Sequence, residues 1–235
     1  MGKILSFFKK ILFPLICVII ILSLFLFWWI PKFERSVSVH AVLPLSGEVI
    51  VIDPGHGGYD PGVMFDEEIL EKDIVLEIGF YLREFLQQGG AEVVMTRDDD
   101  ADFLQTSVGP KKRMDMQNRL EFINEIDPDF VVSIHTNYIP SPIWRGAQTF
   151  YHKDCEESKF LADSIQKELI RVLENTERAA KFADYYLLVE SPVPASLVEA
   201  GFLSNPEEAE LLTTPEYQKK IAWAIYLGII NYHDC

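Results

Sequence analysis

Two histidines and two glutamates stand at positions where a chain of alternating strands and helices could bring them together. His56 lies in the glycine-rich turn PGHGG after the apolar run EVIVID, and His135 directly follows the run FVVSI. Glu199 follows SLV, and Glu71 opens a helical pattern. In open α/β sheets, sites collect at the carboxyl ends of the strands, so we expect these four side chains to converge.

This set of residues has the chemistry of a hydrolytic metal site. Two imidazoles and one carboxylate with an open fourth position are typical of catalytic zinc, which lowers the pKa of bound water to about 7. A further carboxylate nearby can accept the proton from that water and deliver it to a leaving amine. Glu199 fits this second role.

Each of these residues also has an ordinary structural interpretation. A single histidine beside a strand is more often packed than a ligand, but the glycines at 55, 57 and 58 turn the backbone tightly around His56 and leave it accessible. Glu71 could instead stabilise a helix dipole, and Glu199 could cap a turn. Because the spacings match no short zinc motif, the pattern alone leaves both interpretations open. The remaining histidines are expected to be solvated: His40, His152 and His233.

The elements that must position these residues alternate between strand and helix patterns. Helices are predicted over residues 71–88, 117–126, 156–173, 207–212 and 215–232, and strands over 48–53, 92–96, 130–134, 146–151, 185–189 and 195–199. This alternation predicts an α/β fold with a single mixed, largely parallel sheet and helices on both faces. The charged runs at 98–102 and 111–113 are interpreted as solvated, with a substrate-edge loop between them as the alternative.

The N-terminal segment differs from the rest of the chain. Residues 11–30 contain no charge, and about 20 such residues cross a hydrocarbon core of about 30 Å, so a transmembrane helix is predicted there. Residues 1–10 are predicted to be cytoplasmic because lysines precede the span. Residues 31–46 are a predicted linker and 47–235 one catalytic domain outside the cytoplasm. A cleaved signal peptide is less favoured, because the apolar run is long and no clear cleavage motif follows.

Charge and cysteine content narrow the function further. Residues 36–235 carry 16 basic and 35 acidic side chains, a net charge of −19, which argues against nucleic acid as a partner and against adsorption to phosphate-rich wall polymers. The three cysteines are Cys17, Cys155 and Cys235, and no C-x-x-C motif occurs. Neither a thiolate zinc site nor a disulfide framework is indicated, and a Cys155–Cys235 bridge is less favoured than two free thiols.

Four blocks of the sequence together resemble the zinc-dependent N-acetylmuramoyl-L-alanine amidases. They are VIDPGHGGYDPG at 51–62, LEKDIVLEIG at 70–79, SIHTN at 133–137 and VEAGFLSN at 198–205. The resemblance covers nearly all of residues 47–233 and implies that His56, Glu71 and His135 hold Zn²⁺ while Glu199 acts in catalysis. The implied reaction is hydrolysis of the amide between the lactyl group of N-acetylmuramic acid and L-alanine in peptidoglycan.

Other segments resemble the germination-specific members of this family from spore-forming bacteria. These are the apolar anchor, LPLSG at 43–47 and ENTERAAKFADYYLL at 174–188. The resemblance implies action in spore cortex maturation, where muramic δ-lactam forms, and a location in the forespore membrane facing the cortex. The expected partners are peptidoglycan strands with their peptide stems, the membrane through the N-terminal helix, and an accessory protein.

Some assignments remain open at this stage. Arg97, Asn137 and Arg178 are weaker candidates for positioning the substrate, and surface or structural roles are equally expected for them. A catalytically inactive, membrane-tethered wall-binding or regulatory module could have the same fold. Another zinc muropeptide hydrolase is the second alternative, since fold and metal do not define the bond that is cleaved.

Overall fold

The computed structural model describes residues 6–29, 43–66, 68–104 and 109–233, and the chain divides into two units, Met1–Ala41 and Val42–Cys235. The first unit contains a short π-helix, η1 (Phe8–Leu12), and an α-helix, α2 (Phe13–Trp29). Within the described ranges, no helix combines the length and the apolar character needed to cross a membrane. The transmembrane helix expected over residues 11–30 is therefore not supported.

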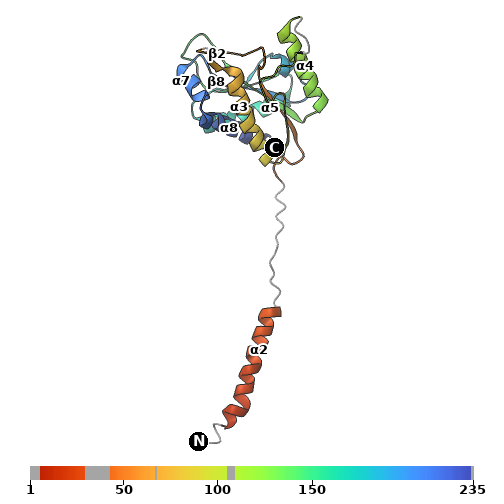
Figure 1. Ribbon diagram of the computed structural model, residues 1–235, viewed down its shortest axis with the longest axis vertical. Coiled ribbons are helices and arrows are strands. Elements are labelled where there is room, and N and C mark those ends of the chain that lie inside the picture. The colour runs from red at the N-terminus through yellow and green to blue at the C-terminus, as the bar shows by residue number, and fades with distance from the viewer. Residues whose placement is uncertain (1–5, 30–42, 67, 105–108, 234–235) are drawn as a thin grey trace. The chain divides into compact units, whose positions relative to one another are not determined.

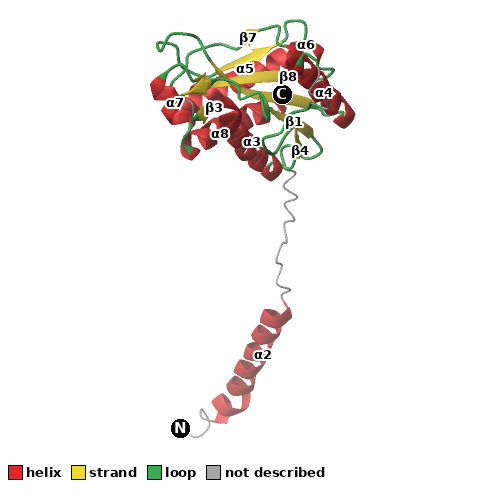
Figure 2. Ribbon diagram, turned by 45° about the horizontal axis from the view of Figure 1, so that its top comes forward, coloured by secondary structure: helices red, strands yellow, loops and turns green. Residues whose placement is uncertain are grey.

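A six-stranded mixed sheet forms the centre of the second unit (Figure 2). Its strand order is β4-β1-β5-β8-β6-β7. The pairs β1–β4, β1–β5, β5–β8 and β6–β7 are parallel, and only β6 runs antiparallel to β8. The strands span Val49–Pro54 (β1), Glu92–Met95 (β4), Phe130–Asn137 (β5), Gln148–Tyr151 (β6), Lys181–Phe182 (β7) and Ala195–Phe202 (β8). The prediction of a largely parallel mixed sheet is confirmed.

Helices cover both faces of this sheet, as the alternating pattern predicted (Figure 1). Ile50 and Ile52 of β1 face the larger apolar cluster beneath α3, α5 and α8, while Val51 points to the smaller cluster beneath α4 and α6. The helices span Glu71–Gln88 (α3), Lys111–Ile126 (α4), Glu156–Leu173 (α5), Tyr186–Glu190 (α6), Pro206–Leu212 (α7) and Pro215–His233 (α8). A short antiparallel pair, β2 (Met64–Phe65) and β3 (Ile69–Leu70), lies directly before α3.

Two element predictions were wrong. The run YYLLV was expected to form a strand, but residues 186–190 form α6, with the N–H of Val189 bonded to the carbonyl of Tyr185. A short apolar run has no period that separates strand from helix, and burial of Leu187 and Leu188 against the sheet decides the outcome. Helix α4 also begins six residues earlier than expected, because the polar KKRMDM stretch shows no apolar period.

The folded unit begins before the expected boundary at Gly47. Leu45 is fully buried in the larger apolar cluster, and its N–H donates to the carbonyl of Gly89 at 2.9 Å. Residues 43–46 therefore pack on the domain instead of belonging to the linker. The rest of that linker, residues 31–42, lies outside the described residues, as do His40 and Cys235, so the Cys155–Cys235 pairing stays untested.

Candidate metal centre and active site

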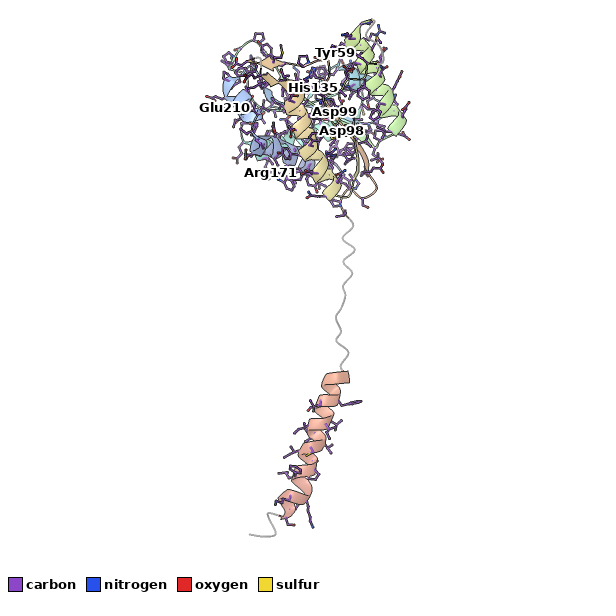
Figure 3. All side chains as sticks on the ribbon, in the orientation of Figure 1. Tyr59, Asp98, Asp99, His135, Arg171 and Glu210 are labelled. Atoms are coloured by element: carbon purple, nitrogen blue, oxygen red, sulfur yellow. The ribbon has the colours of Figure 1, made fainter. Side chains whose placement is uncertain are left out.

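Three neighbouring strands deliver functional side chains to one edge of the sheet. His56 follows β1, His135 lies near the end of β5, and Glu199 lies on β8, with the Cα atoms of His135 and Glu199 paired across the two strands. Helix α3 adds Glu71 as its first residue. All four line one cavity of about 530 Å³, and Figure 3 labels His135 within the domain.

Three donor atoms in this cavity form a compact triangle. Oε1 of Glu71 lies 3.2 Å from Nε2 of His56 and 3.2 Å from Nδ1 of His135, and those two nitrogens are also 3.2 Å apart. Zinc bonds of about 2.0–2.1 Å in a tetrahedron separate neighbouring donors by about 3.3 Å. The donor types and their spacing therefore fit an ion of this size.

Glu71 is held as a carboxylate by the surrounding backbone. Its Oε1 accepts the N–H of Thr136 and its Oε2 accepts the N–H of Val63, both at 2.8 Å. Burial alone would raise its pKa, but hydrogen bonds and charge from His135 and His56 keep the pKa of Glu71 well below the usual range. A metal ligand must be deprotonated, and this environment favours that state.

The turn that carries His56 has little steric freedom. His56 itself has φ 61°, and Gly57 and Gly58 follow with φ 121° and 54°, a left-handed region that glycine tolerates best. A Cβ on Gly55 would lie 2.1 Å from Cε1 of His135, so only glycine fits beside that imidazole. Gly55 thus allows His135 to lie against the turn that carries His56.

Asp60 orients the imidazole of His56 from the far side. Its Oδ2 lies 3.0 Å from Nδ1 of His56, four residues earlier. Burial would lower the pKa of His56, but contacts with Asp60 and Glu71 outweigh it and raise the pKa to about 9 without metal. A carboxylate behind a metal-binding imidazole fixes its orientation. Asp60 was not among the predicted site residues, although it lies in the segment HGGYD that begins with His56.

A buried ion pair supports the same turn from below. Nη1 of Arg119 donates to Oδ1 of Asp53 at 2.8 Å, and Nη2 donates to the carbonyl of His56 at 3.0 Å. Asp53 also accepts hydrogen bonds from the hydroxyls of Thr96 and Ser133. The sequence gives no signal for this pairing, because Asp53 and Arg119 lie on separate elements.

Glu199 stands apart from the donor triangle and is 8% exposed. Its Oε1 accepts a hydrogen bond from the hydroxyl of Tyr185 at 3.4 Å, while Oε2 has no hydrogen-bond partner in the described part of the chain. Burial, assisted by the negative charge of Glu71, raises the pKa of Glu199 to about 7 despite the opposing charge of His135. A carboxyl group near neutrality can both accept and donate a proton.

The three weaker candidates occupy different positions. Asn137 lines the cavity at the end of β5. Arg97 is buried and donates to the carbonyls of Pro54, Gly55, Lys72 and Asp99, so its guanidinium is engaged by the backbone. Arg178 lies outside this cavity, with its guanidinium 4.9 Å from the ring centroid of Phe202. The structure thus brings only Asn137 of the three to the site.

An α/β domain with a His–Glu–His donor group beside a buried carboxylate has the composition of a metal-dependent hydrolase. Residues 50–231 match the N-acetylmuramoyl-L-alanine amidase family, and the chain belongs to this family. It is 46% identical over 194 residues, 81% of each chain, to the germination-specific N-acetylmuramoyl-L-alanine amidase of Bacillus subtilis (strain 168). The family resemblance seen in the sequence is confirmed.

Solved structures agree with this membership. The CwlD amidase of Clostridioides difficile, solved in complex with the GerS lipoprotein, is 43% identical with a TM-score of 0.76, covering 79% of this chain and 98% of that one. An N-acetylmuramoyl-L-alanine amidase of Nostoc punctiforme is 32% identical with a TM-score of 0.71, covering 81% of this chain and 99% of that one.

Proposed function

We propose that this protein is a zinc-dependent amidase that hydrolyses the bond between the lactyl group of N-acetylmuramic acid and L-alanine in peptidoglycan. Membership of the amidase family supports the reaction. The observation that carries the metal assignment is the 3.2 Å triangle of donor atoms from His56, Glu71 and His135. Two imidazoles and one carboxylate are a common catalytic zinc set.

The residues around this triangle divide the chemistry between them. His56, Glu71 and His135 would hold a zinc ion, which would supply a Lewis acid to polarise the carbonyl and lower the pKa of a water molecule. Glu199 would accept a proton from the water that attacks the carbonyl carbon, and would donate it to the nitrogen as the carbon–nitrogen bond breaks. The hydroxyl of Tyr185 holds Oε1 of Glu199 in place. The products are a free lactyl carboxylate and a peptide with an L-alanine amino terminus.

The spore cortex is the substrate that we propose within this reaction class. Support comes from the name of the Bacillus subtilis relative, which is a germination-specific amidase. We also propose that the domain acts outside the cytoplasm at the forespore membrane, because peptidoglycan lies there. The lipoprotein complex of the Clostridioides difficile relative supports an accessory protein as a partner.

Mass spectrometry of purified peptidoglycan treated with the zinc-loaded protein tests the reaction. We expect free muramic acid carboxylate together with peptides that begin at L-alanine. A shortened peptide or a lost acetyl group would indicate another zinc hydrolase, and unchanged material would indicate an inactive wall-binding module. Muramic δ-lactam should disappear from spores that lack the protein, and normal lactam content would contradict the cortex assignment.

A further inference from the structure

A second hollow extends the catalytic cavity past the start of α4. It has a volume of about 570 Å³ and is lined by Pro110, Lys111, Lys112, Arg113, Met116 and Tyr186. Lys112, Met116 and Tyr186 also line the cavity that holds the donor triangle. The two hollows are therefore neighbours that share part of their walls, and we call the second hollow the α4 groove.

Three exposed cations stand along this groove on an otherwise acidic domain. Lys111, Lys112 and Arg113 are all exposed, and within the described residues none of them forms an ion pair. Lys111 lies over the ring of Tyr59, 5.4 Å from its centroid, and Figure 3 shows Tyr59 beside α4. The remaining cation of the catalytic cavity, Arg119, is 2% exposed and already bonded. The groove thus presents positive charge that no ion pair among the described residues neutralises.

These three cations lie at the N-terminus of α4, where positive charge does not stabilise the helix. The first turn of α4 contains no acidic residue, and Pro110 at its N-cap makes no side-chain capping bond. Positive charges at a helix N-terminus oppose the helix dipole, so the three side chains do not stabilise α4. An anion bound in the groove would satisfy both the cations and the uncapped helix end.

We propose that the α4 groove binds the peptide stem of the substrate and that Lys112, with its two neighbours, binds free carboxylates of that stem. This inference rests on the proposed amidase function. The glycan strand carries no charge once the lactyl group is amidated, so the peptide is the part of the substrate that complements these cations. Met116 and Tyr186 offer apolar surface to the aliphatic parts of the peptide. The stem then leaves the metal donors toward α4.

The test uses two muropeptide substrates that differ only in their carboxylates, which are free in one and amidated in the other. Lys112→Glu should raise KM for the free-carboxylate substrate about tenfold with kcat within about twofold, because exposed charge contributes to binding of substrate and transition state alike. KM for the amidated substrate should change less than about twofold. KM of the wild-type protein for the free-carboxylate substrate should also rise with salt.

Lys219→Glu on α8 is the matched control, since Lys219 is exposed and α8 covers the opposite face of the sheet. It makes the same charge change and should leave both KM values unaltered. Circular dichroism and zinc content should match the wild-type protein for both variants. These controls separate a local effect in the groove from a change in net charge or folding.

Several outcomes would overturn the inference. If Lys112→Glu raises KM equally for both substrates, or changes KM for neither, the groove does not recognise free carboxylates. Inhibition by a phosphate polymer without any preference for free carboxylates would assign the cations to wall polymers. If the wild-type protein cleaves neither substrate, the proposed function fails instead. Calorimetry then still tests the groove, because Lys112→Glu must weaken binding of the free-carboxylate muropeptide.

Discussion

Nη2 of Arg119 donates a hydrogen bond to the main-chain carbonyl oxygen of His56 at 3.0 Å, so helix α4 fixes the turn that carries a candidate metal ligand. The other terminal nitrogen of Arg119 pairs with Asp53 at 2.8 Å, and both side chains are almost fully buried. The position of His56 therefore depends on a buried ion pair at the wall of the catalytic cavity.

Loss of this ion pair should destabilise the whole domain. Arg119→Ala leaves the carboxylate of Asp53 buried without its cation, and breaking such a pair costs about 3–5 kcal/mol. We expect a fall of that size in the free energy of unfolding, measured by urea denaturation, together with lower zinc content. Arg113→Ala, at an exposed position of the same helix, should change stability by less than about 0.5 kcal/mol. A loss below about 1 kcal/mol for Arg119→Ala would contradict this account.

Metal binding and proton transfer should separate in two variants. His135→Ala removes one of three donors, so zinc content and activity should fall together. Glu199→Gln keeps the shape but cannot accept a proton, so zinc should remain while turnover falls by about 10²–10⁴-fold. Elemental analysis and peptide release measure the two effects. If folded Glu199→Gln protein loses zinc as fully as His135→Ala, Glu199 is a ligand and the assigned roles must change.

The buried carboxyl of Glu199 should make the metal-free protein less stable as pH rises. Burial raises its pKa from 4.5 to about 7, so the folded state binds more protons than the unfolded state between these values. The contribution of Glu199 to the free energy of unfolding is therefore complete below about pH 4.5, and it is lost as pH rises through about 7.

Glu199→Gln removes this titration and should match the wild-type protein at low pH. Above pH 7 it should be more stable by about 3 kcal/mol, since one pKa unit corresponds to about 1.4 kcal/mol. Denaturation of chelator-treated protein across pH 4–8 measures the difference. A constant difference between the two proteins over that range would show that Glu199 does not carry the pH dependence.

A single methyl group at position 55 should disrupt the donor triangle. The Cβ of Gly55→Ala would lie 2.1 Å from Cε1 and 2.4 Å from Nε2 of His135, so the imidazole must move away. We expect zinc affinity to fall about 10–100-fold, as is typical when a neighbour no longer orients a metal ligand. Competition with a chelator measures the affinity.

Gly79→Ala, inside α3, is the control, because the nearest neighbours of its Cβ would be Met95 Cε and Pro54 Cγ at 3.1 Å and Ile52 Cγ2 at 3.7 Å, and neither imidazole is among them. It should retain wild-type zinc affinity. Wild-type affinity in folded Gly55→Ala protein would mean that His135 tolerates displacement and does not define the site.

Much of the fold could be predicted from local pattern. Helices α3 and α5 have the predicted bounds, because each combines a clear apolar stripe with distinct ends. The strands β1, β5 and β8 were predicted near their observed positions, since buried strands appear as continuous apolar runs. His56, His135 and Glu199 follow those runs, and parallel strands place their carboxyl ends together. The sequence alone therefore predicted that these three side chains lie close together.

Contacts between distant elements were decided only by tertiary packing. Residues 186–190 form a helix because Leu187 and Leu188 are buried against the sheet, which a short apolar run does not reveal. Arg97 was a candidate for substrate binding, but the fold surrounds it with main-chain carbonyls. Arg119 carried no signal of its own, because its ion pair with Asp53 and its contact with the carbonyl of His56 depend on which elements meet in space. The spacing of apolar residues in the sequence indicates which face of a helix or strand is buried. The partners of a buried charge come from other elements, so they are determined only when those elements pack together.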